Sequence, residues 1–442
     1  MIHMASPLFI KNVNIIPMPG SRILHGYDVI IEGARIKQIL SSRKQKSEKF
    51  TGRVINGTGK FLIPGLFDMH VHLESKSFFP LFLMNGITAI REVGSTRKDI
   101  FQLRDKVNSG NIIGPRMFIA GPILEGDPPF WQGFKNLRTA AEAKKAVGEL
   151  KKKGADFIKV YDTLTPKVYT MILETAHKLG LNVTGHIPSS MDMFAALRAG
   201  QDCFEHIDTL GNSIFKITWT KKKGQWVVGK IKLSGPKLAM LLRQLSIKKS
   251  AVCPTLVFFE KYAKLATYKK LLGSQEMRYM PKYYGSVAWN PSHPKSFANI
   301  KGKDPQWFRN AGNIAKPMLK LIPLLQKKGI VLLAGSDTPN AFVVPGFSLI
   351  EELKLLVLAG LKPFQALEAA TYNSSLFLGV SHELGTIERG KIANLVLLRK
   401  NPLQNISYIR SVEGVIINNT YLSSKDIKKS IKKYKSLYTP GV

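Results

Sequence analysis

The strongest constraint on the fold is a change of pattern at residue 61. From there on, apolar runs of four to eight residues alternate with amphipathic stretches of helical period, such as Ala140–Lys153, Pro166–Leu179 and Met191–Arg198. This alternation is typical of parallel strands joined by crossover helices, because such strands are buried on both faces. The runs predict eight strands, at Leu62–His72, Ala89–Val93, Met117–Ala120, Phe157–Tyr161, Asn182–His186, Cys203–His206, Ala251–Leu256 and Val331–Ser336. We therefore predict an α/β chain with a (β/α)8 TIM-like barrel, whose active site would lie at the carboxyl ends of the strands.

The first of these strands carries two histidines. Asp68, His70 and His72 alternate along it, and the two-residue period of a strand would turn their side chains to one face. Two imidazoles on one face suit a divalent metal ion, but two nearby histidines also occur by chance. The metal hypothesis therefore depends on further ligands at the ends of other strands.

Such residues are present. Lys159, His186, His206 and Asp337 each follow an apolar run, and in a barrel all of them would meet His70 and His72 at one mouth. Imidazoles and carboxylates are the expected ligands of a catalytic zinc-type site. We predict that His70, His72 and Asp337 hold one divalent ion and that His186 and His206 hold a second.

Lys159 does not suit such a site as an ammonium, because a cation repels a metal ion. A buried lysine with a lowered pKa can instead be carboxylated by carbon dioxide, and the resulting carbamate is an anion that can bridge two metals. We predict two divalent ions, assigned as zinc, with carboxylated Lys159 as the bridging ligand.

The chain as a whole resembles the amidohydrolase superfamily, and is similar to its imidazolonepropionase-like and metal-dependent Xaa-Pro dipeptidase (prolidase-like) branch. The motifs that carry the resemblance span nearly the whole chain. They are Pro64-Gly65-Leu66-Phe67-Asp68-Met69-His70-Val71-His72, the strand Phe157–Tyr161, Thr184-Gly185-His186-Ile187-Pro188, Glu205-His206-Ile207, Gly335-Ser336-Asp337, and Gly385–Val396. Asn394 and Ile350 depart from the family pattern, but neither position is a metal ligand in that family.

The resemblance implies roles for the site residues. Two zinc-like ions would share a hydroxide, and Asp337 would take its proton and pass it to the leaving amine. Tyr161 would donate to the oxyanion or hold a substrate carboxylate, although a packing role with a satisfied hydroxyl is equally open.

The resemblance also implies a domain plan, because Gly385–Val396 is similar to the strand pair that returns to the N-terminal sheet. Residues 1–61 read as short alternating segments, and Asp28–Leu40 contains a predicted hairpin. We expect residues 1–61 and 379–422 to form a small β-sandwich domain from both chain ends. Residues 62–378 would form the barrel, and residues 423–442 a basic C-terminal helix or tail.

Composition limits the partners. The chain has 65 basic and 30 acidic residues, a net charge of +35, which favours anionic partners such as a carboxylate-bearing substrate. The lysines are scattered, so no specific nucleic acid partner is expected.

No apolar run is long enough for a transmembrane segment. Cys203 and Cys253 lie in apolar runs and are expected to be reduced, which predicts a cytoplasmic protein. The composition is compatible with a homo-oligomer.

Three function classes follow. The first is a binuclear metal hydrolase that cleaves the C–N bond of a small amide, such as a dipeptide or N-acyl amino acid, by a metal-bridging hydroxide. The second is a mononuclear cyclic-amide hydrolase or deaminase, against which Lys159 argues because a bridging ligand has little purpose with one ion. The third is a non-catalytic basic binding protein on the same scaffold.

The sequence leaves two roles open for each of two segments. The basic stretch Lys216–Lys249 is predicted either as a hairpin flap over the barrel mouth or as a surface excursion. Within Tyr262–Arg309, the aromatic residues Tyr283, Tyr284, Trp289 and Trp307 are candidates for a substrate lid or for ordinary packing. His177 is expected to have a packing or surface role.

Overall fold

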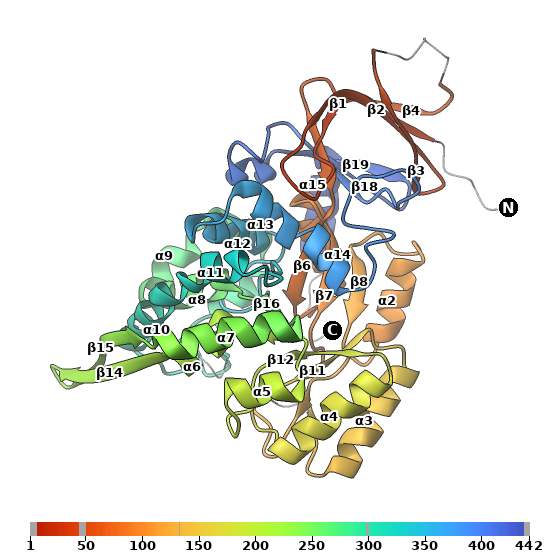
Figure 1. The fold of residues 1–442 in the computed structure, drawn as a ribbon. Helices are drawn as coiled ribbons and strands as arrows, with labels where there is room; N and C mark the ends of the chain where they lie inside the picture. The colour runs from red at the N-terminus through yellow and green to blue at the C-terminus, as the bar shows by residue number, and fades with distance from the viewer. Residues whose placement is uncertain (1–6, 44–49, 132, 298–299, 437–442) are drawn as a thin grey trace.

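The computed structural model describes residues 7–43, 50–131, 133–297 and 300–436 (Figure 1). Strands from both ends of the chain form one eight-stranded sheet in the order β19-β18-β17-β5-β1-β2-β3, with β4 beside β1. Their bounds are β1 (Leu8–Ile15), β2 (Leu24–Glu32), β3 (Arg35–Ser41), β4 (Arg53–Asn56), β5 (Phe61–Pro64), β17 (Leu395–Leu398), β18 (Val412–Ile417) and β19 (Thr420–Ser423). The hairpin predicted within Asp28–Leu40 is confirmed, since β2 and β3 pair antiparallel.

The predicted strand Leu62–His72 is wrong as one element, because it is two strands in two sheets. β5 pairs with β1 and β17 in the sheet of the chain ends, and β6 (Leu66–Val71) pairs with β7 (Ile87–Glu92). The change falls at Gly65, whose N–H donates to Asn394, whereas the next residue donates to Gly86. A Cβ at Gly65 would lie 1.9 Å from Thr88 Oγ1, so only glycine fits this crossing.

The parallel strands of the rest of the chain form two sheets. The first has the order β6-β7-β8, and the second the order β10-β9-β11-β12-β13-β16. Their further bounds are β8 (Arg116–Ile119), β9 (Leu124–Glu125), β10 (Lys135–Asn136), β11 (Phe157–Val160), β12 (Asn182–Gly185), β13 (Cys203–Glu205) and β16 (Ala251–Cys253). The short strands β9 and β10 were not predicted.

The predicted eighth strand, Val331–Ser336, is not a regular strand. Its backbone hydrogen bonds alternate between the two sheets: Leu333 donates to Val252 of β16 at 2.9 Å, and Met69 of β6 donates to Ala334 at 2.9 Å. Isolated bridges join Leu332 to Val252 and Thr338 to Val71. On the other side, Asp156 donates to Ile119 at the end of β8. The fold is thus mixed α/β, with two parallel sheets linked through single bridges.

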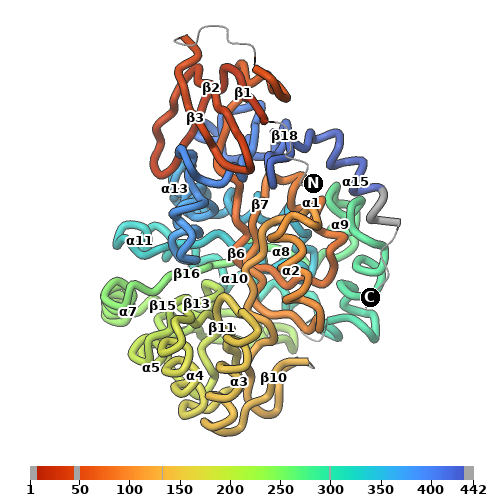
Figure 2. Tube along the Cα trace, turned by 90° about the vertical axis from the view of Figure 1, so that its right-hand side faces the viewer, coloured from red at the N-terminus to blue at the C-terminus, as the bar shows by residue number. Residues whose placement is uncertain are grey.

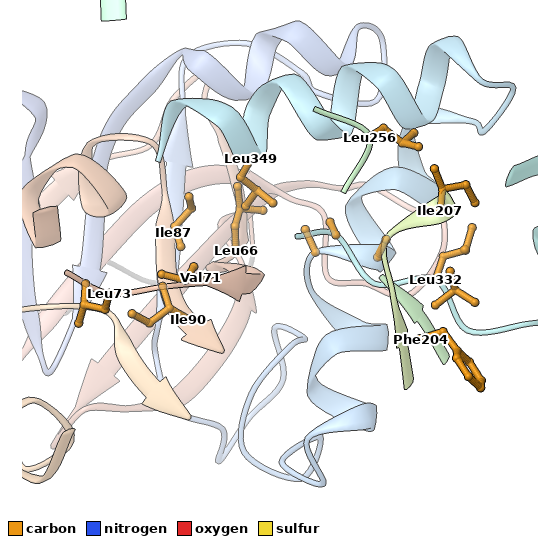
Figure 3. Packing of buried hydrophobic residues seen from close by; sticks show 14 of the residues in the cluster. Leu66, Val71, Leu73, Ile87, Ile90, Phe204, Ile207, Leu256, Leu332 and Leu349 are labelled. Atoms are coloured by element: carbon orange, nitrogen blue, oxygen red, sulfur yellow. The ribbon is translucent and has the colours of Figure 1, made fainter. Parts of the chain in front are cut away.

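Helices cover these sheets (Figures 1 and 2). They are α1 (Phe79–Met84), α2 (Ile100–Asn108), α3 (Ala140–Lys152), α4 (Pro166–Lys178), α5 (Met193–Ala199), α6 (Ile207–Ile214), α7 (Gly235–Lys248), α8 (Leu256–Lys264), α9 (Tyr268–Leu272), α10 (Pro305–Met318), α11 (Leu321–Lys327), α12 (Phe347–Leu358), α13 (Pro363–Ala369), α14 (Tyr372–Phe377) and α15 (Ser424–Ser436). Local signals explain their starts: Thr139 and Glu142 form a capping box at α3, and Asp192 caps α5. The main core lies between strands and helices, where Leu66 packs near Leu349 of α12 (Figure 3).

The basic stretch after residue 215 forms a long hairpin of β14 (Phe215–Lys222) and β15 (Gln225–Leu233), which extends away from the body at the left of Figure 1. It is followed by α7. Asn310 of α10 holds β15 by accepting from Val228 N and donating to Trp226 O. At the carboxyl end, the expected basic helix is α15, while residues 437–442 lie outside the described residues. None of the described helices combines the length and apolar character that crossing a membrane requires.

Candidate metal centre

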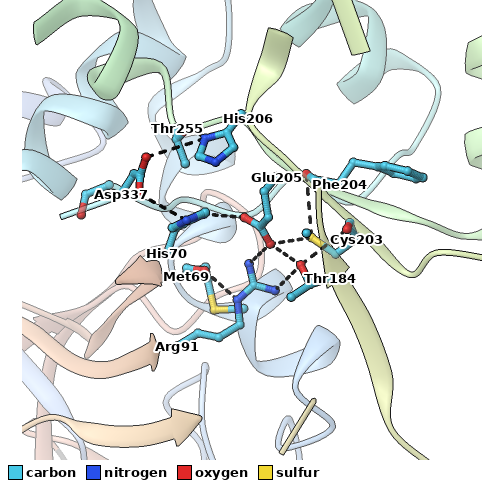
Figure 4. A network of polar contacts seen from close by, with 12 residues as sticks. Met69, His70, Arg91, Thr184, Cys203, Phe204, Glu205, His206, Thr255 and Asp337 are labelled. Atoms are coloured by element: carbon cyan, nitrogen blue, oxygen red, sulfur yellow. Dashed lines mark hydrogen bonds and ion pairs between the residues drawn. The ribbon is translucent and has the colours of Figure 1, made fainter. Parts of the chain in front are cut away.

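The predicted site residues lie at the carboxyl ends of the parallel strands, where the structure brings them together. Asp337 Oδ1 is 3.3 Å from His70 Nε2 and 3.4 Å from His72 Nε2. The ring of His206 is 4.8 Å from the ring of His70 and 4.8 Å from the ring of His186. Lys159 is buried and lines the same cavity. Figure 4 shows Asp337 between His206 and His70.

Unusual backbone conformations place two of these side chains. His206 has φ 66° and Asp337 has φ 64°, and Thr255 beside His206 has φ 46°. A positive φ is uncommon for residues other than glycine and costs free energy, so it persists where the surrounding structure enforces it. The positive φ of His206 and Asp337 occurs where the chain turns toward the cavity. Ser336 supports Asp337 by donating from N and Oγ to Asp68 of β6, at 2.9 and 2.6 Å.

All four imidazoles use Nδ1 for a contact within the protein. His70 Nδ1 is 2.7 Å from Glu205 Oε2, and His72 Nδ1 is 3.0 Å from the carbonyl oxygen of Gly94. The remaining two contacts are His186 Nδ1 with Asp162 Oδ1 at 2.9 Å and His206 Nδ1 with Thr255 Oγ1 at 2.7 Å. Partners of this kind fix the ring and its tautomer, and they leave Nε2 available as a metal ligand.

The Glu205 carboxylate connects His70 to a buried arginine, which the sequence reasoning missed. Arg91 Nη2 donates to Glu205 Oε1 at 2.6 Å, Thr184 Oγ1 donates to the same oxygen, and Arg91 Nε donates to Met69 O (Figure 4). Burial alone would raise the pKa of Glu205, but the charge of Arg91 and the hydrogen bond with His70 hold that pKa well below its usual range. A signal was present, because Arg91 and Glu205 are charged residues inside apolar strand runs, which is rare unless they are paired.

Breaking the Arg91–Glu205 pair is expected to lower the stability of the folded protein strongly. Glu205→Gln removes the negative charge and leaves the Arg91 guanidinium buried without a counter-charge, since both side chains are fully buried. We expect the free energy of unfolding, measured with urea, to fall by about 3 kcal/mol. The control is Glu383→Gln, which alters surface pairs with Arg35 and Arg116 and should cost less than about 1 kcal/mol. Equal costs for the two variants would contradict a paired buried charge.

The donor set fits divalent metal ions. Ligand atoms of His70, His206 and Asp337 lie within 4.8 Å of one another. Burial lowers the pKa of His70 to about 4, so its imidazole is neutral and can coordinate. Burial works against the charged form of Asp337, but the nearby imidazoles more than offset it and hold its pKa below the usual range. Among the described residues, Lys159 Nζ is buried without a hydrogen-bond partner, and burial lowers its pKa, as a lysine that reacts as an amine requires.

His72, Lys159, His186, His206 and Asp337 line one large cavity of about 1450 Å³, while His70 lies buried behind them. Tyr161 lies in its wall, with its ring 4.1 Å from the ring of His186. The surplus positive charge of the chain is not concentrated here. The cationic lining residues are Arg97, Lys98, Lys159 and Lys237, and the acidic ones are Glu74, Asp99, Asp162, Asp192, Asp208 and Asp337. Acidic residues outnumber cationic ones in this lining, so the net positive charge of the chain does not by itself favour a carboxylate-bearing substrate at this cavity.

The alternative loop assignments are also resolved. No residue of the β14–β15 hairpin is among the described residues that line the cavity, so the hairpin itself is a surface excursion. The rest of the stretch Lys216–Lys249 includes α7, whose Lys237 and Met240 do line the cavity. The described residues that line the cavity do not include Tyr283, Tyr284, Trp289 or Trp307 either. Trp289 is fully buried and donates from Nε1 to Pro339 O. His177 contacts Asp202 on the outside of α4, through Nε2 at 2.9 Å, which agrees with a packing or surface role.

Comparison with known proteins agrees with the geometry of the site. The model of the "Amidohydrolase family" matches residues 61–422. Ochratoxinase from Aspergillus niger is 22% identical over 420 residues, covering 80% of this chain and 73% of the relative. Adenine deaminase from Staphylothermus marinus is 26% identical over 215 residues, which span 41% of this chain and only 32% of that protein. The crystal structure of a putative prolidase from Bifidobacterium longum superimposes with a TM-score of 0.71 at 25% identity, covering 98% of this chain and 99% of the other.

A family match over most of the chain identifies its class: this protein belongs to the amidohydrolase family. It is an enzyme of the class that acts on carbon–nitrogen bonds.

Proposed function

We propose that this enzyme hydrolyses the C–N bond of a small amide, such as a dipeptide or an N-acyl amino acid. The observation that carries the proposal is the set of four imidazoles oriented through Nδ1 around Asp337, with the buried and unpaired amine of Lys159 lining the same cavity. A deaminase or cyclic-amide hydrolase with one ion would leave that amine without a role.

The metal ligands follow from these contacts. We propose that His70, His72 and Asp337 hold one divalent ion, that His186 and His206 hold the other, and that both are zinc. Lys159 Nζ would add to carbon dioxide and release a proton, and the resulting carbamate would bind between them. We further infer that the two parallel sheets are two arcs of one (β/α)8 barrel, because Val331–Ser336 bonds to both of them.

The residues of the chain then perform distinct steps. Bound zinc would supply Lewis acidity and lower the pKa of water toward about 7. Asp337 would accept the proton of the attacking water through a carboxylate oxygen and donate it to the leaving nitrogen, because its Oδ1 contacts both His70 and His72. Burial raises the pKa of Tyr161, so its hydroxyl stays protonated and would donate to the developing oxyanion or to a substrate carboxylate.

A substrate panel tests the function. Xaa-Pro and Xaa-Arg dipeptides and N-acyl amino acids are compared with lactones and cyclic ureas, with release of the free amine measured. We expect amide hydrolysis that stops after treatment with a chelator and returns when zinc is added back. Turnover of the lactones alone would show that the amide assignment is wrong.

A further inference from the structure

The cavity contains a first group of aromatic side chains beside His186. The loop between β9 and β10 supplies Phe130, Trp131 and Phe134. Phe130 and Phe134 lie 5.9 and 5.4 Å from the ring of Tyr161, and Phe130 lies 5.5 Å from Trp131. We call these residues, together with Tyr161, the β9–β10 wall. Because Tyr161 stacks on His186, this wall begins at the edge of the candidate metal centre.

A second group lies beside His206. Phe258 and Phe259 belong to the first turn of α8, directly after β16. Their rings are 6.0 and 6.5 Å from the ring of His206 and 5.1 Å from each other. We call this pair the α8 wall. A chain of ring contacts thus runs from the β9–β10 wall through His186 and His206 to the α8 wall, and places the walls at its two ends.

Most of these aromatic side chains lie outside the core, although Phe259 packs against the main hydrophobic cluster. Among the described residues, Phe130, Trp131, Phe134, Tyr161 and Phe258 belong to none of the three hydrophobic clusters, nor are they packed against one. Phe130 is 51% exposed although it faces a cavity. Several apolar rings gathered in one concave surface are typical of a ligand site, because their exposure to water is otherwise unfavourable.

The size of the cavity points the same way. Pockets that enclose drug-sized ligands measure roughly 300–1,000 Å³, and this cavity is about 1450 Å³. A dipeptide of small residues would leave both walls in contact with water. A molecule that reaches both walls from a scissile bond near His186 and His206 needs a large apolar group on each side of that bond.

We infer that the substrates are amides that carry a large aromatic group on both the acyl and the amine side, one ring contacting each wall. N-aroyl derivatives of aromatic amino acids have this form. The inference rests on the proposed C–N hydrolysis and adds its substrate class.

The experiment compares N-(2-naphthoyl)-L-phenylalanine, which has two aromatic groups, with N-acetylglycine, which has none. N-acetyl-L-phenylalanine and N-(2-naphthoyl)glycine each carry one. We expect kcat/KM to be at least about 100-fold higher for the first compound than for N-acetylglycine, because each stacked ring is expected to give about tenfold. Phe130→Ala and Phe258→Ala should each reduce that ratio by about tenfold. The matched control Trp219→Ala truncates a similarly exposed aromatic on the hairpin, outside the cavity, and should leave the ratio unchanged.

Binding separates this inference from the proposed reaction. Calorimetric titration of the inactive Asp337→Asn variant with N-(2-naphthoyl)-L-phenylalanine should show binding that the added Phe130→Ala change weakens about tenfold. Such binding without amide cleavage by the unmodified enzyme would refute the proposed reaction but keep the aromatic site. The aromatic inference alone would be overturned by a different result. In that case the enzyme cleaves small amides, the ratio of the two kcat/KM values is the same in all three alanine variants, and Phe130→Ala does not weaken binding.

Discussion

Asp337→Asn is expected to lower kcat for amide hydrolysis by about 10²–10⁴-fold. Asparagine keeps the shape of the side chain but cannot accept a proton, so the attacking water loses its base and the leaving nitrogen loses its acid. Asp337 is buried, and its Oδ1 contacts both His70 and His72, so a second carboxylate cannot easily replace it.

The controls for this variant concern folding and surface charge. Asp105→Asn removes a carboxylate that is 66% exposed on α2 and should leave kcat unchanged. The circular dichroism spectrum of Asp337→Asn should match that of the unmodified protein. A fall in kcat of less than about threefold, far below the range for a lost general base, would remove Asp337 from the proton-transfer role.

Lys159→Met is expected to abolish turnover and reduce bound zinc, while the folded state becomes no less stable. Methionine has a similar length but carries no nitrogen to react with carbon dioxide. Its thioether replaces a buried amine that makes no hydrogen bond with the described residues. Because a buried, unpaired polar group costs about 1–3 kcal/mol, removing it should maintain or raise the thermal midpoint of the metal-free protein.

Measuring turnover, bound zinc and the thermal midpoint together distinguishes the loss of a metal ligand from the loss of the fold. Lys153→Met, at the exposed end of α3, controls for the removal of a lysine charge and should change neither activity nor metal content. If Lys159→Met kept its activity, the carbamate would have no part in the reaction. If it were inactive only because it unfolds, the thermal midpoint would fall.

The sequence predicted which candidate ligands lie together better than it predicted their surroundings. His186, His206 and Asp337 were identifiable because each follows a buried run, and parallel strands deliver such positions to one edge. The Arg91–Glu205 pair was missed because a charged pair across two strands leaves no spacing pattern. The prediction placed Leu62–His72 in one strand and so missed the crossing at Gly65, where the close approach of Thr88 leaves room only for glycine.

The substrate surface was the least predictable part. Four aromatic residues within Tyr262–Arg309 were candidates for a lid or for ordinary packing, and one of them, Trp289, packs in the core. The rings of Phe130 and Phe134, which were not candidates, line the cavity. Both kinds of residue look alike in sequence, since an aromatic ring suits a core and a ligand site equally. Which role it takes depends on loop geometry, which apolar periodicity does not encode.

The most direct test of the account is the number of metal ions bound per chain. The protein is purified in the presence of zinc and bicarbonate, and its metal content is measured by mass spectrometry beside that of Lys159→Met. The account predicts about two zinc ions per chain for the unmodified protein, as a two-metal site requires, and a clearly lower content for the variant. One ion per chain, or equal contents in both proteins, would contradict it.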